Sequence, residues 1–174
     1  DRRDLLWYAG GIVRLWRGEV AHRGIREKDQ GQFDAAEATD YVTGCAMLIK
    51  STCLQELGGL DEAYYMYSED VDFCLRAQQA GFEILFCPDA KIWHKISASS
   101  GGSGVAEGLT AFKVRQKIRG NFRFLSKFAR WYQWPTILIF TLVNGLKAAF
   151  LMLRGKNFKG VIAMLSPGSR RGRS

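Results

Sequence analysis

Three carboxylates lie within four residues of one another, at Glu69, Asp70 and Asp72. Tyrosines precede this acidic cluster and apolar residues follow it, so concentrated negative charge stands beside apolar and aromatic surface. Such charge must be solvated, paired with cations or used in chemistry. A positioned carboxylate can take a proton from a hydroxyl group as a general base. The acidic cluster is therefore the first candidate for a reactive site.

Local signals place the acidic cluster in the first turn of a short helix. Ser68 suits the N-cap, the acids complement the positive end of the helix dipole, and Gly81 can close the C-terminus. On this helix Glu69 and Asp72 share one face, while Asp70 points elsewhere and could face a cleft. From this segment alone, three surface acids that only complement the dipole are an equally good interpretation.

The segments around the cluster alternate between strand and helix patterns. Residues 41–50 are apolar on both faces, which indicates a buried central strand, and residues 82–87 and 91–94 are predicted to form further strands. Ser51 is expected to cap a short helix that ends at Gly58. This alternation predicts an α/β sheet.

The first forty residues carry weaker signals. Residues 5–15 suit short strands and a turn, whereas residues 16–40 are polar and are predicted to form a long loop over the cleft, with a solvated His22. The chain begins abruptly, which we interpret as a piece of a longer protein. Four single cysteines predict reduced core thiols and fit a cytosolic compartment. They are Cys45, Cys53, Cys74 and Cys87.

The charge of the chain is sharply divided. Residues 1–107 hold 11 Lys or Arg residues and all 17 acidic residues, a net charge of −6, whereas residues 108–174 hold 14 basic residues and no acid. The two parts must meet different surroundings. We therefore expect an α/β part at 1–107 and a basic, apolar helical tail at 108–174.

The tail has the features of a membrane-associated segment. A helix is expected from about residue 109 to 132, and residues 135–153 contain one charged residue and approach the length that spans a bilayer. Polar residues on one stripe of this second helix make an interfacial position at least as good an interpretation as a span. The stripe consists of Gln133, Thr136, Asn144, Lys147 and Arg154. Aromatic residues before the apolar run favour an anionic membrane over nucleic acid as the partner.

Several motifs occur together in one order between residues 44 and 90, within a similarity that covers roughly residues 6 to 127. They are Gly44-Cys45-Ala46-Met47-Leu48-Ile49, Gly58-Gly59-Leu60-Asp61-Glu62, Tyr65-Met66-Tyr67-Ser68-Glu69-Asp70-Val71-Asp72-Phe73-Cys74-Leu75-Arg76, Gly81-Phe82 and Pro88-Asp89-Ala90. In order and spacing this set resembles the acceptor-side half of family 2 glycosyltransferases, in particular bacterial rhamnosyltransferase-like enzymes that build cell-surface polysaccharides. Several motifs in order are more specific than any one of them.

The resemblance implies roles for individual residues. It makes Asp70 the base that takes the acceptor proton, in an inverting transfer from a nucleotide-sugar donor, while Glu69 and Asp72 orient the acceptor and the neighbouring backbone. Gly44 and Trp93 are expected to line the substrate site.

Arg119 resembles the arginine of an Arg-Asn pair in these enzymes, although here Gly120 separates the two residues. It could therefore reach a diphosphate or a lipid phosphate. The alternative is that Arg119 is one more cation on a basic helix.

The resemblance also implies a divalent metal. His94 stands where these enzymes place a histidine that helps to bind Mg²⁺ or Mn²⁺. The other ligands should be carboxylates of an Asp-x-Asp motif, but the only such motif here contains Asp70 and Asp72, which are assigned to the acceptor side. We therefore expect this chain by itself to transfer no sugar and to bind metal weakly.

The sequence thus predicts a partial glycosyltransferase A type, Rossmann-like α/β sheet followed by C-terminal helices. The predicted function is sugar transfer to a glycan acceptor, expected to be lipid-linked, at the cytoplasmic face of the cell membrane. The alternative from another class is a non-catalytic module that uses the same half-fold to bind a membrane or a protein partner.

Overall fold

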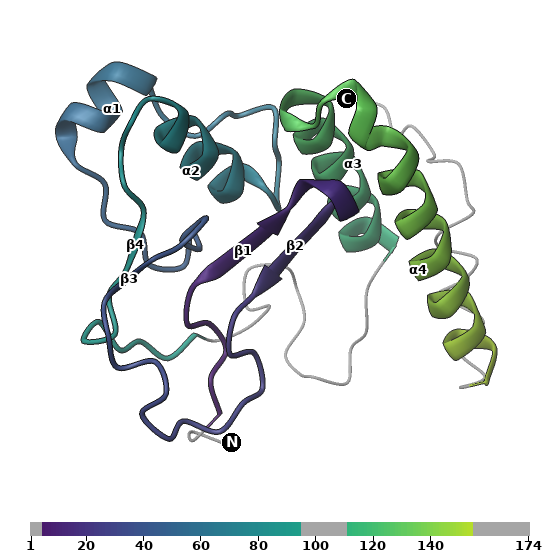
Figure 1. Cartoon of the computed structure of the whole chain (residues 1–174), viewed down its shortest axis with the longest axis horizontal. Helices are drawn as coiled ribbons and strands as arrows, with labels where there is room; N and C mark the ends of the chain where they lie inside the picture. The colour runs from purple at the N-terminus through teal and green to yellow at the C-terminus, as the bar shows by residue number, and fades with distance from the viewer. Residues whose placement is uncertain (1–4, 95–110, 155–174) are drawn as a thin grey trace, which may run out of the picture.

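The computed structural model describes residues 5–94 and 111–154. Short strands, loops and two shorter helices form the first part of these residues, and two long helices form the last part (Figure 1). The elements in chain order are β1 (Gly11–Arg14), η1 (Leu15–Arg17), β2 (Glu19–His22), β3 (Glu37–Ala38), α1 (Ser51–Leu57), α2 (Glu69–Gln79), β4 (Leu85–Phe86), α3 (Ala111–Phe128), η3 (Trp131–Gln133) and α4 (Trp134–Arg154).

The described strands form two small antiparallel sheets. In the first, β1 and β2 make a hairpin in which Gly11 pairs with His22 and Arg14 pairs with Glu19. In the second, β3 pairs with β4 over two residues. Together with the helices these sheets confirm the predicted α/β class and agree with the partial glycosyltransferase A type fold that the resemblance implies.

The prediction of a central strand at residues 41–50 is wrong, because this segment contains no strand. Two of its backbone N–H groups are bound by side chains of α2 instead of by a neighbouring strand. The Gly44 N–H donates to the Asp70 carboxylate over 3.0 Å, and the Val42 N–H lies 3.4 Å from the Cys74 sulfur. Side chains of a helix therefore replace the ladder that the apolar pattern predicted.

Two other strand predictions also fail in whole or in part. Residues 91–94 form no strand, and the strand expected at residues 82–87 shrinks to Leu85–Phe86. Residues 16–40 contain β2 and β3 and are not one long loop. His22 belongs to β2, where its ring lies 4.6 Å from the Trp7 ring, so the expectation of a solvated loop histidine is wrong.

Both ends of α2 match their sequence signals. Ser68 occupies the N-cap, although its side chain makes no capping hydrogen bond. At the other end Gly81 has a φ of 88°, a left-handed conformation that favours glycine, and its N–H donates to the Gln78 carbonyl over 3.0 Å. At α1 the prediction is off by one position, because Lys50 is the N-cap and Ser51 is the first helical residue.

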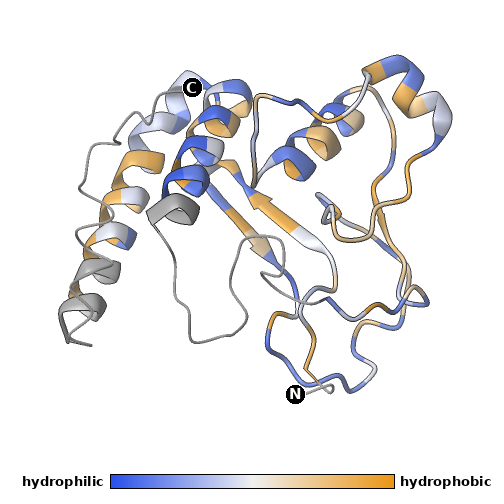
Figure 2. Ribbon diagram, turned by 180° about the vertical axis from the view of Figure 1, so that it is seen from behind, coloured by the Kyte–Doolittle hydropathy of each residue, from blue (hydrophilic) through white to orange (hydrophobic). Residues whose placement is uncertain are grey.

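One apolar core joins the hairpin, α2, α3 and α4. Its fully buried members include Tyr41 from the loop before α1, Cys74 from α2 and Phe124 from α3. Much of the β1–β2 hairpin, which packs on this core, has the colour of hydrophobic residues in Figure 2. Because α3 and α4 share this core with α2, both long helices pack against the α/β part. The predicted division near residue 107 falls among residues 95–110, which lie outside the described structure.

The four cysteines separate into two kinds. Cys53 and Cys74 are buried, as the sequence predicts, and burial raises the pKa of the Cys74 thiol to about 11. Cys45 and Cys87 are exposed, so for these two the prediction of core thiols is wrong. All four are free thiols.

The apolar segment near the C-terminus forms α4, close to the predicted bounds. Within residues 5–94 and 111–154 no helix combines the length and the hydropathy that crossing a membrane requires. In the predicted polar stripe, Gln133 is buried, while the side chains of Lys147 and Arg154 lie outside the described residues.

Candidate active site

Asp70 stands in the first turn of α2 and faces the loop that contains Gly44. One carboxylate oxygen accepts the Gly44 N–H over 3.0 Å, and the other accepts the Val71 N–H over 2.9 Å. The carboxylate is only partly buried, and the described residues offer it no side-chain cation. The Asp70 carboxylate therefore has a fixed orientation, and no described side chain neutralises its charge.

Asp72 lies in the opposite environment, since its side chain is fully buried. Lys127 Nζ donates to its Oδ1 over 2.7 Å, Arg76 Nε donates to its Oδ2 over 2.8 Å, and the Tyr64 hydroxyl donates to Oδ1 over 3.2 Å. Two residues along a helix correspond to a rotation of about 200°, so Asp70 and Asp72 must point to different sides. Asp72 has no solvent-accessible surface with which to orient an acceptor, contrary to that part of the expectation.

The Asp72 network connects three elements. Lys127 belongs to α3, so its contact with Asp72 fastens α3 to α2. Arg76 also donates to the carbonyl of Leu57 over 3.0 Å and to that of Gly59 over 2.9 Å, which fixes the end of α1. The network thus sets the position of α2, and with it the position of Asp70.

Glu69 is half-buried beside Asp70. Its Oε2 atom is buried and has no hydrogen-bond partner among the described residues. Burial is the largest cause that raises the pKa of the Glu69 carboxyl above its ordinary value, and the nearby charge of Asp70 raises it further. A carboxyl with a raised pKa beside an open carboxylate is typical of sites where protons are exchanged, although ion-pair networks also produce such shifts.

Tyrosines close the inner side of this site. Tyr41 is buried, and the pKa of its hydroxyl is raised by desolvation first and by the charge of Asp70 second. Its ring lies so close to Gly11 that a Cβ there would come within 2.2 Å of the ring. Sequence reasoning missed both residues, because it placed Tyr41 in a strand and Gly11 among the short strands and turn of residues 5–15. Their contact between separate segments has no local signal.

α3 touches the turn that starts α2. Tyr67 and Ser68 have φ values of 71° and 72°, a strained left-handed backbone for residues other than glycine. A Cβ on Gly120 of α3 would lie 2.6 Å from the Tyr67 carbonyl oxygen. The glycine that separates Arg119 from Asn121 therefore permits this close approach. The available signal was an isolated glycine inside an amphipathic helix, which often marks a packing contact.

Arg119 lies on one wall of an open groove of about 370 Å³. The groove is lined by Ala63, Tyr64, Tyr65, Met66, Gln116, Arg119, Gly120 and Arg123. Arg123 is bound to Asp61 over 3.0 Å, whereas no hydrogen bond or ion pair is found for Arg119 among the described residues. Both arginines line the groove, so it is suited to an anionic group.

Trp93 and His94 end the described part of the loop after β4. Trp93 is 76% exposed. His94 Nε2 lies 3.5 Å from the Cys45 sulfur, and Cys45 follows the Gly44 that binds Asp70, so this loop end lies beside the site. The His94 ring also packs against Trp7 at 4.7 Å.

The described residues do not form a divalent-metal site by themselves. No group of three or more His, Cys, Asp or Glu side chains with ligand geometry occurs in the part of the chain that the structure describes. A thiol and an imidazole also do not match the oxygen-rich ligand set that Mg²⁺ prefers. His94 as a metal ligand therefore stays a prediction, and no chemical step is derived through a metal.

Comparison with known proteins gives one family and several relatives. Residues 10–122, nearly two thirds of the chain, match the model of the family described as glycosyltransferase like family 2. No solved structure matches the chain.

One similar protein is the N-acetylglucosaminyl-diphospho-decaprenol L-rhamnosyltransferase of Mycobacterium tuberculosis, 34% identical over 61 residues, which are 35% of this chain and 20% of that protein. Rhamnosyltransferase WbbL of Escherichia coli is 37% identical over 49 residues, which are 28% of this chain and 19% of that protein. The low-salt glycan biosynthesis hexosyltransferase Agl10 of Haloferax volcanii is 33% identical over 57 residues, 33% of this chain and 19% of that protein. The matched segments thus cover about a fifth of these relatives.

Proposed function

Since the chain belongs to glycosyltransferase family 2, we propose that it carries the acceptor side of an enzyme that transfers a sugar from a nucleotide-sugar donor to a glycan. One observation carries the proposal: Asp70 is held by the Gly44 N–H at a helix start, and no described cation neutralises it. Its neighbour Asp72 is already bound by Arg76 and Lys127. Asp70 is thus the carboxylate of the acidic cluster best suited to act as a base.

The proposed reaction is a single displacement. The Asp70 carboxylate takes the proton of an acceptor hydroxyl while that oxygen forms a bond to the anomeric carbon of the donor sugar. The bond between the anomeric carbon and the diphosphate oxygen breaks, and the nucleoside diphosphate leaves with the electron pair. Because attack comes from the face opposite the leaving group, the anomeric configuration inverts.

The groove beside the site supports a phosphate-bearing acceptor. Arg119 and Arg123 would contact the phosphate, and Trp93 would contact a sugar ring through its exposed face. The Mycobacterium relative is named for a diphospho-decaprenol substrate, which favours a lipid-linked acceptor here as well. We place this acceptor at the cytoplasmic face of the cell membrane, in the synthesis of a cell-surface polysaccharide.

The donor site is proposed to lie mainly in sequence outside this chain. A non-catalytic module on the same half-fold is the alternative. The sequence of the remainder of the protein decides between the enzyme and the module. An Asp-x-Asp motif after a nucleotide-binding βαβ pattern supports the enzyme, and a longer chain without them supports the module.

The test is Asp70→Asn in the shortest form of the protein that transfers sugar. The amide keeps the size of the carboxylate but cannot accept the proton, so turnover should fall by about 10²-fold or more, roughly 3 kcal/mol of transition-state stabilisation. Donor binding and the circular dichroism spectrum should be retained. Asp34→Asn, at an exposed carboxylate in the loop before β3, is the matched control. Turnover near that of the unsubstituted enzyme would remove Asp70 from the mechanism.

A further inference from the structure

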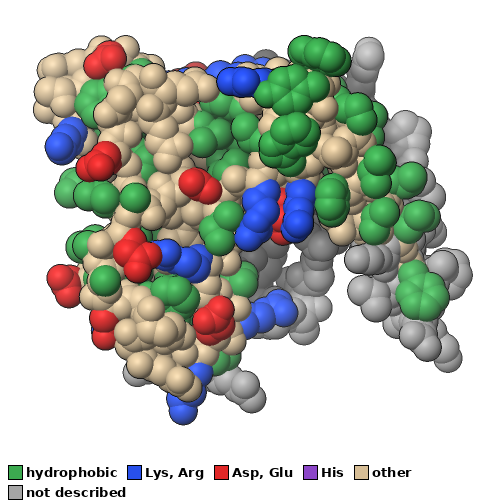
Figure 3. All heavy atoms as spheres, in the orientation of Figure 1, with side chains coloured by type: hydrophobic (Ala, Val, Ile, Leu, Met, Phe, Trp, Pro, Cys, Tyr) green, Lys and Arg blue, Asp and Glu red, His purple; other side chains and the backbone are tan. Residues whose placement is uncertain are grey.

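The outer face of α4 is apolar and open to solvent. Ile137 is buried against the core, but Leu138, Leu142 and Leu146 are 61%, 63% and 62% exposed. These leucines repeat every four residues, so they share one side of the helix. Ile139 and Val143 continue the same side, and together the five residues define the apolar face of α4. In the space-filling view hydrophobic side chains gather along this helix (Figure 3).

The tip of the β1–β2 hairpin adjoins the start of this face, although it comes from the other end of the chain. The Trp16 ring lies 5.5 Å from the Tyr132 ring, and the Arg17 guanidinium lies 5.1 Å from the centre of the Phe140 ring. A Cβ on Gly18 would lie 3.1 Å from Ile137, so the hairpin packs tightly on α4.

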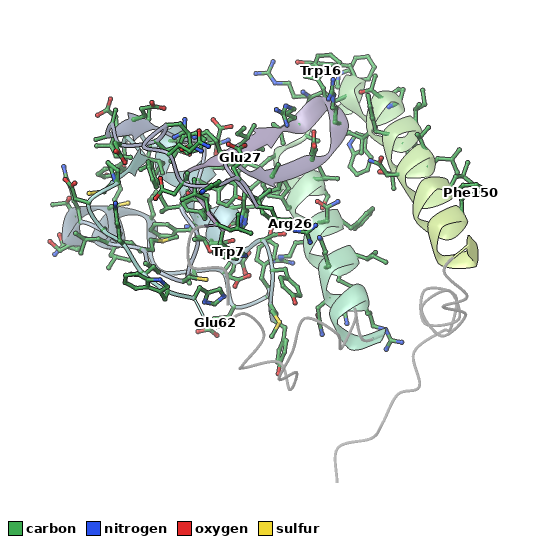
Figure 4. All side chains as sticks on the ribbon, turned by 90° about the horizontal axis from the view of Figure 1, so that it is seen from below. Trp7, Trp16, Arg26, Glu27, Glu62 and Phe150 are labelled. Carbon is green, nitrogen blue, oxygen red and sulfur yellow. The ribbon has the colours of Figure 1, made fainter. Side chains whose placement is uncertain are left out.

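The same surface carries exposed aromatic and basic groups. Trp16 is 54% exposed and Trp131 is 84% exposed. Figure 4 shows Trp16 near the beginning of α4 and Phe150 toward its end. Arg17 makes no ion pair among the described residues, and Arg130 donates to the Tyr132 hydroxyl over 3.0 Å. Apolar residues, tryptophans and arginines therefore occur together at this edge.

These features fit an anionic lipid bilayer better than a second copy of the chain. Trp and Tyr side chains favour the boundary between headgroups and acyl chains, and arginine binds lipid phosphate. Residues 108–174 contain 14 basic residues and no acid, so two copies that met through α4 would repel each other. Because α4 packs on the core through Ile137 and presents its leucines to solvent along one side, it would lie along the surface of the membrane.

We propose that the apolar face of α4 and the hairpin tip, with Trp16 and Arg17, form one docking surface that lies in the interface of an anionic membrane. The inference takes the membrane as partner from the proposed function. It adds which surface of the chain docks and that the β1–β2 hairpin takes part. Both parts are fixed to the Asp70 site, since β1 shares the core with α2 and α3 leads directly into η3 and α4. Docking would thus hold the site at a constant orientation to the lipid.

The first experiment measures binding of the whole chain to vesicles of equal parts phosphatidylglycerol and phosphatidylcholine. Leu142→Ser with Leu146→Ser should weaken binding by about tenfold or more, because two leucines no longer enter the interface. Leu48→Ser with Leu60→Ser is the matched control, since these exposed leucines flank α1, which lies on the opposite side of the molecule from α4 (Figure 1), and should not affect binding. Equal binding by both double variants would overturn the proposal.

The second experiment tests the hairpin through tryptophan fluorescence with brominated lipid in the vesicles. The fluorescence of Trp16 and Trp131 should be quenched on binding, so Trp16→Phe and Trp131→Phe should each reduce the quenched intensity. Trp93→Phe, at another exposed tryptophan, should leave the quenched intensity unchanged. If Trp16→Phe has no effect on the quenched intensity, the hairpin does not belong to the docking surface.

Sedimentation velocity of the chain without lipid tests whether a second copy of the chain covers the apolar face of α4 instead of a membrane. A dimer that dissociates in the Leu142→Ser and Leu146→Ser variant would assign the face to a second copy and overturn the proposal. A monomer with both leucines intact agrees with membrane docking. None of these measurements requires donor or acceptor, so their failure is distinct from a failure of sugar transfer.

Discussion

Asp70 and Asp72 are two residues apart on α2 and carry the same chemical group, yet they lie in different surroundings. Asp72 is fully buried and is bound by Lys127, Arg76 and Tyr64. Asp70 is partly exposed and is bound by backbone N–H groups alone among the described residues. The comparison shows that the surroundings, and not the motif, decide which carboxylate is available for chemistry.

The largest predicted effect concerns the buried member of the pair. Asp72→Asn removes the buried counter-charge of Arg76 and Lys127, and breaking such a pair costs about 3 kcal/mol or more. Lys127 keeps a second, longer contact with Asp61 at 3.8 Å. The cost is moderated because Lys127 keeps 37% of its side chain exposed. We expect a free energy of unfolding lower by about 2–4 kcal/mol in urea denaturation. A loss as small as that of the surface control Asp34→Asn would show that the network does not hold α2.

Next in size is Gly120→Ala, which tests the contact between α3 and the turn before Asp70. Alanine normally stabilises a helix interior by about 1 kcal/mol relative to glycine. Here the new Cβ would meet the Tyr67 carbonyl oxygen at 2.6 Å, so overpacking should cost about 1–3 kcal/mol. Gly145→Ala in α4 is the matched control, because nothing lies within 4 Å of its Cβ position, and it should stabilise the protein. Thermal unfolding of the two variants should therefore shift in opposite directions.

The local parts of this site followed from the sequence. Ser68 and Gly81 predicted the ends of α2, because capping and left-handed backbone depend on residues near in sequence. The motif order indicated the family, which the match to residues 10–122 confirmed. The position of Asp70 as a proposed base came from resemblance and stays a prediction.

The remaining parts depend on contacts between residues far apart in sequence. That Asp72 is buried depends on Lys127, which is 55 residues away and belongs to a different helix. The strand predicted at residues 41–50 failed because α2 side chains, including Asp70, bind the backbone of that segment. Periodicity describes which face of a segment is apolar, but it contains no information about the segment against which that face packs. The docking of the hairpin tip on α4 is another such contact.

A smaller effect is expected for the stability of Asp70→Asn, which completes the comparison. The amide oxygen can still accept the Gly44 N–H, and only the attraction between the carboxylate and the helix N-terminus is lost. The free energy of unfolding should fall by about 0.5–1 kcal/mol. Urea denaturation beside Asp72→Asn gives the direct comparison. If Asp70→Asn is the more destabilising of the two, Asp70 is a structural residue and the assignments of the two carboxylates must be exchanged.

The smallest effect is predicted for Asp61, whose surroundings are intermediate between those of Asp70 and Asp72. The Ala63 N–H and then the Arg123 guanidinium lower the pKa of the Asp61 carboxyl from its ordinary value of 3.8. Because this pKa is lower in the folded protein, the ionised carboxylate stabilises the fold fully above about pH 4. This contribution disappears as the pH falls through the folded-state pKa.

Asp61→Asn should therefore be slightly less stable than the unsubstituted protein at pH 7. The difference in urea midpoint should shrink as the pH is lowered below 3.8. Arg123→Gln should reproduce part of the loss at pH 7, since the Ala63 hydrogen bond remains. Added salt should reduce the contribution of Arg123, because this pair is largely exposed, while the Asp72 network should respond less. A midpoint difference that persists unchanged at low pH would mean that the ionised form of Asp61 makes no contribution, and that of the two carboxylates only Asp72 binds α3 through its charge.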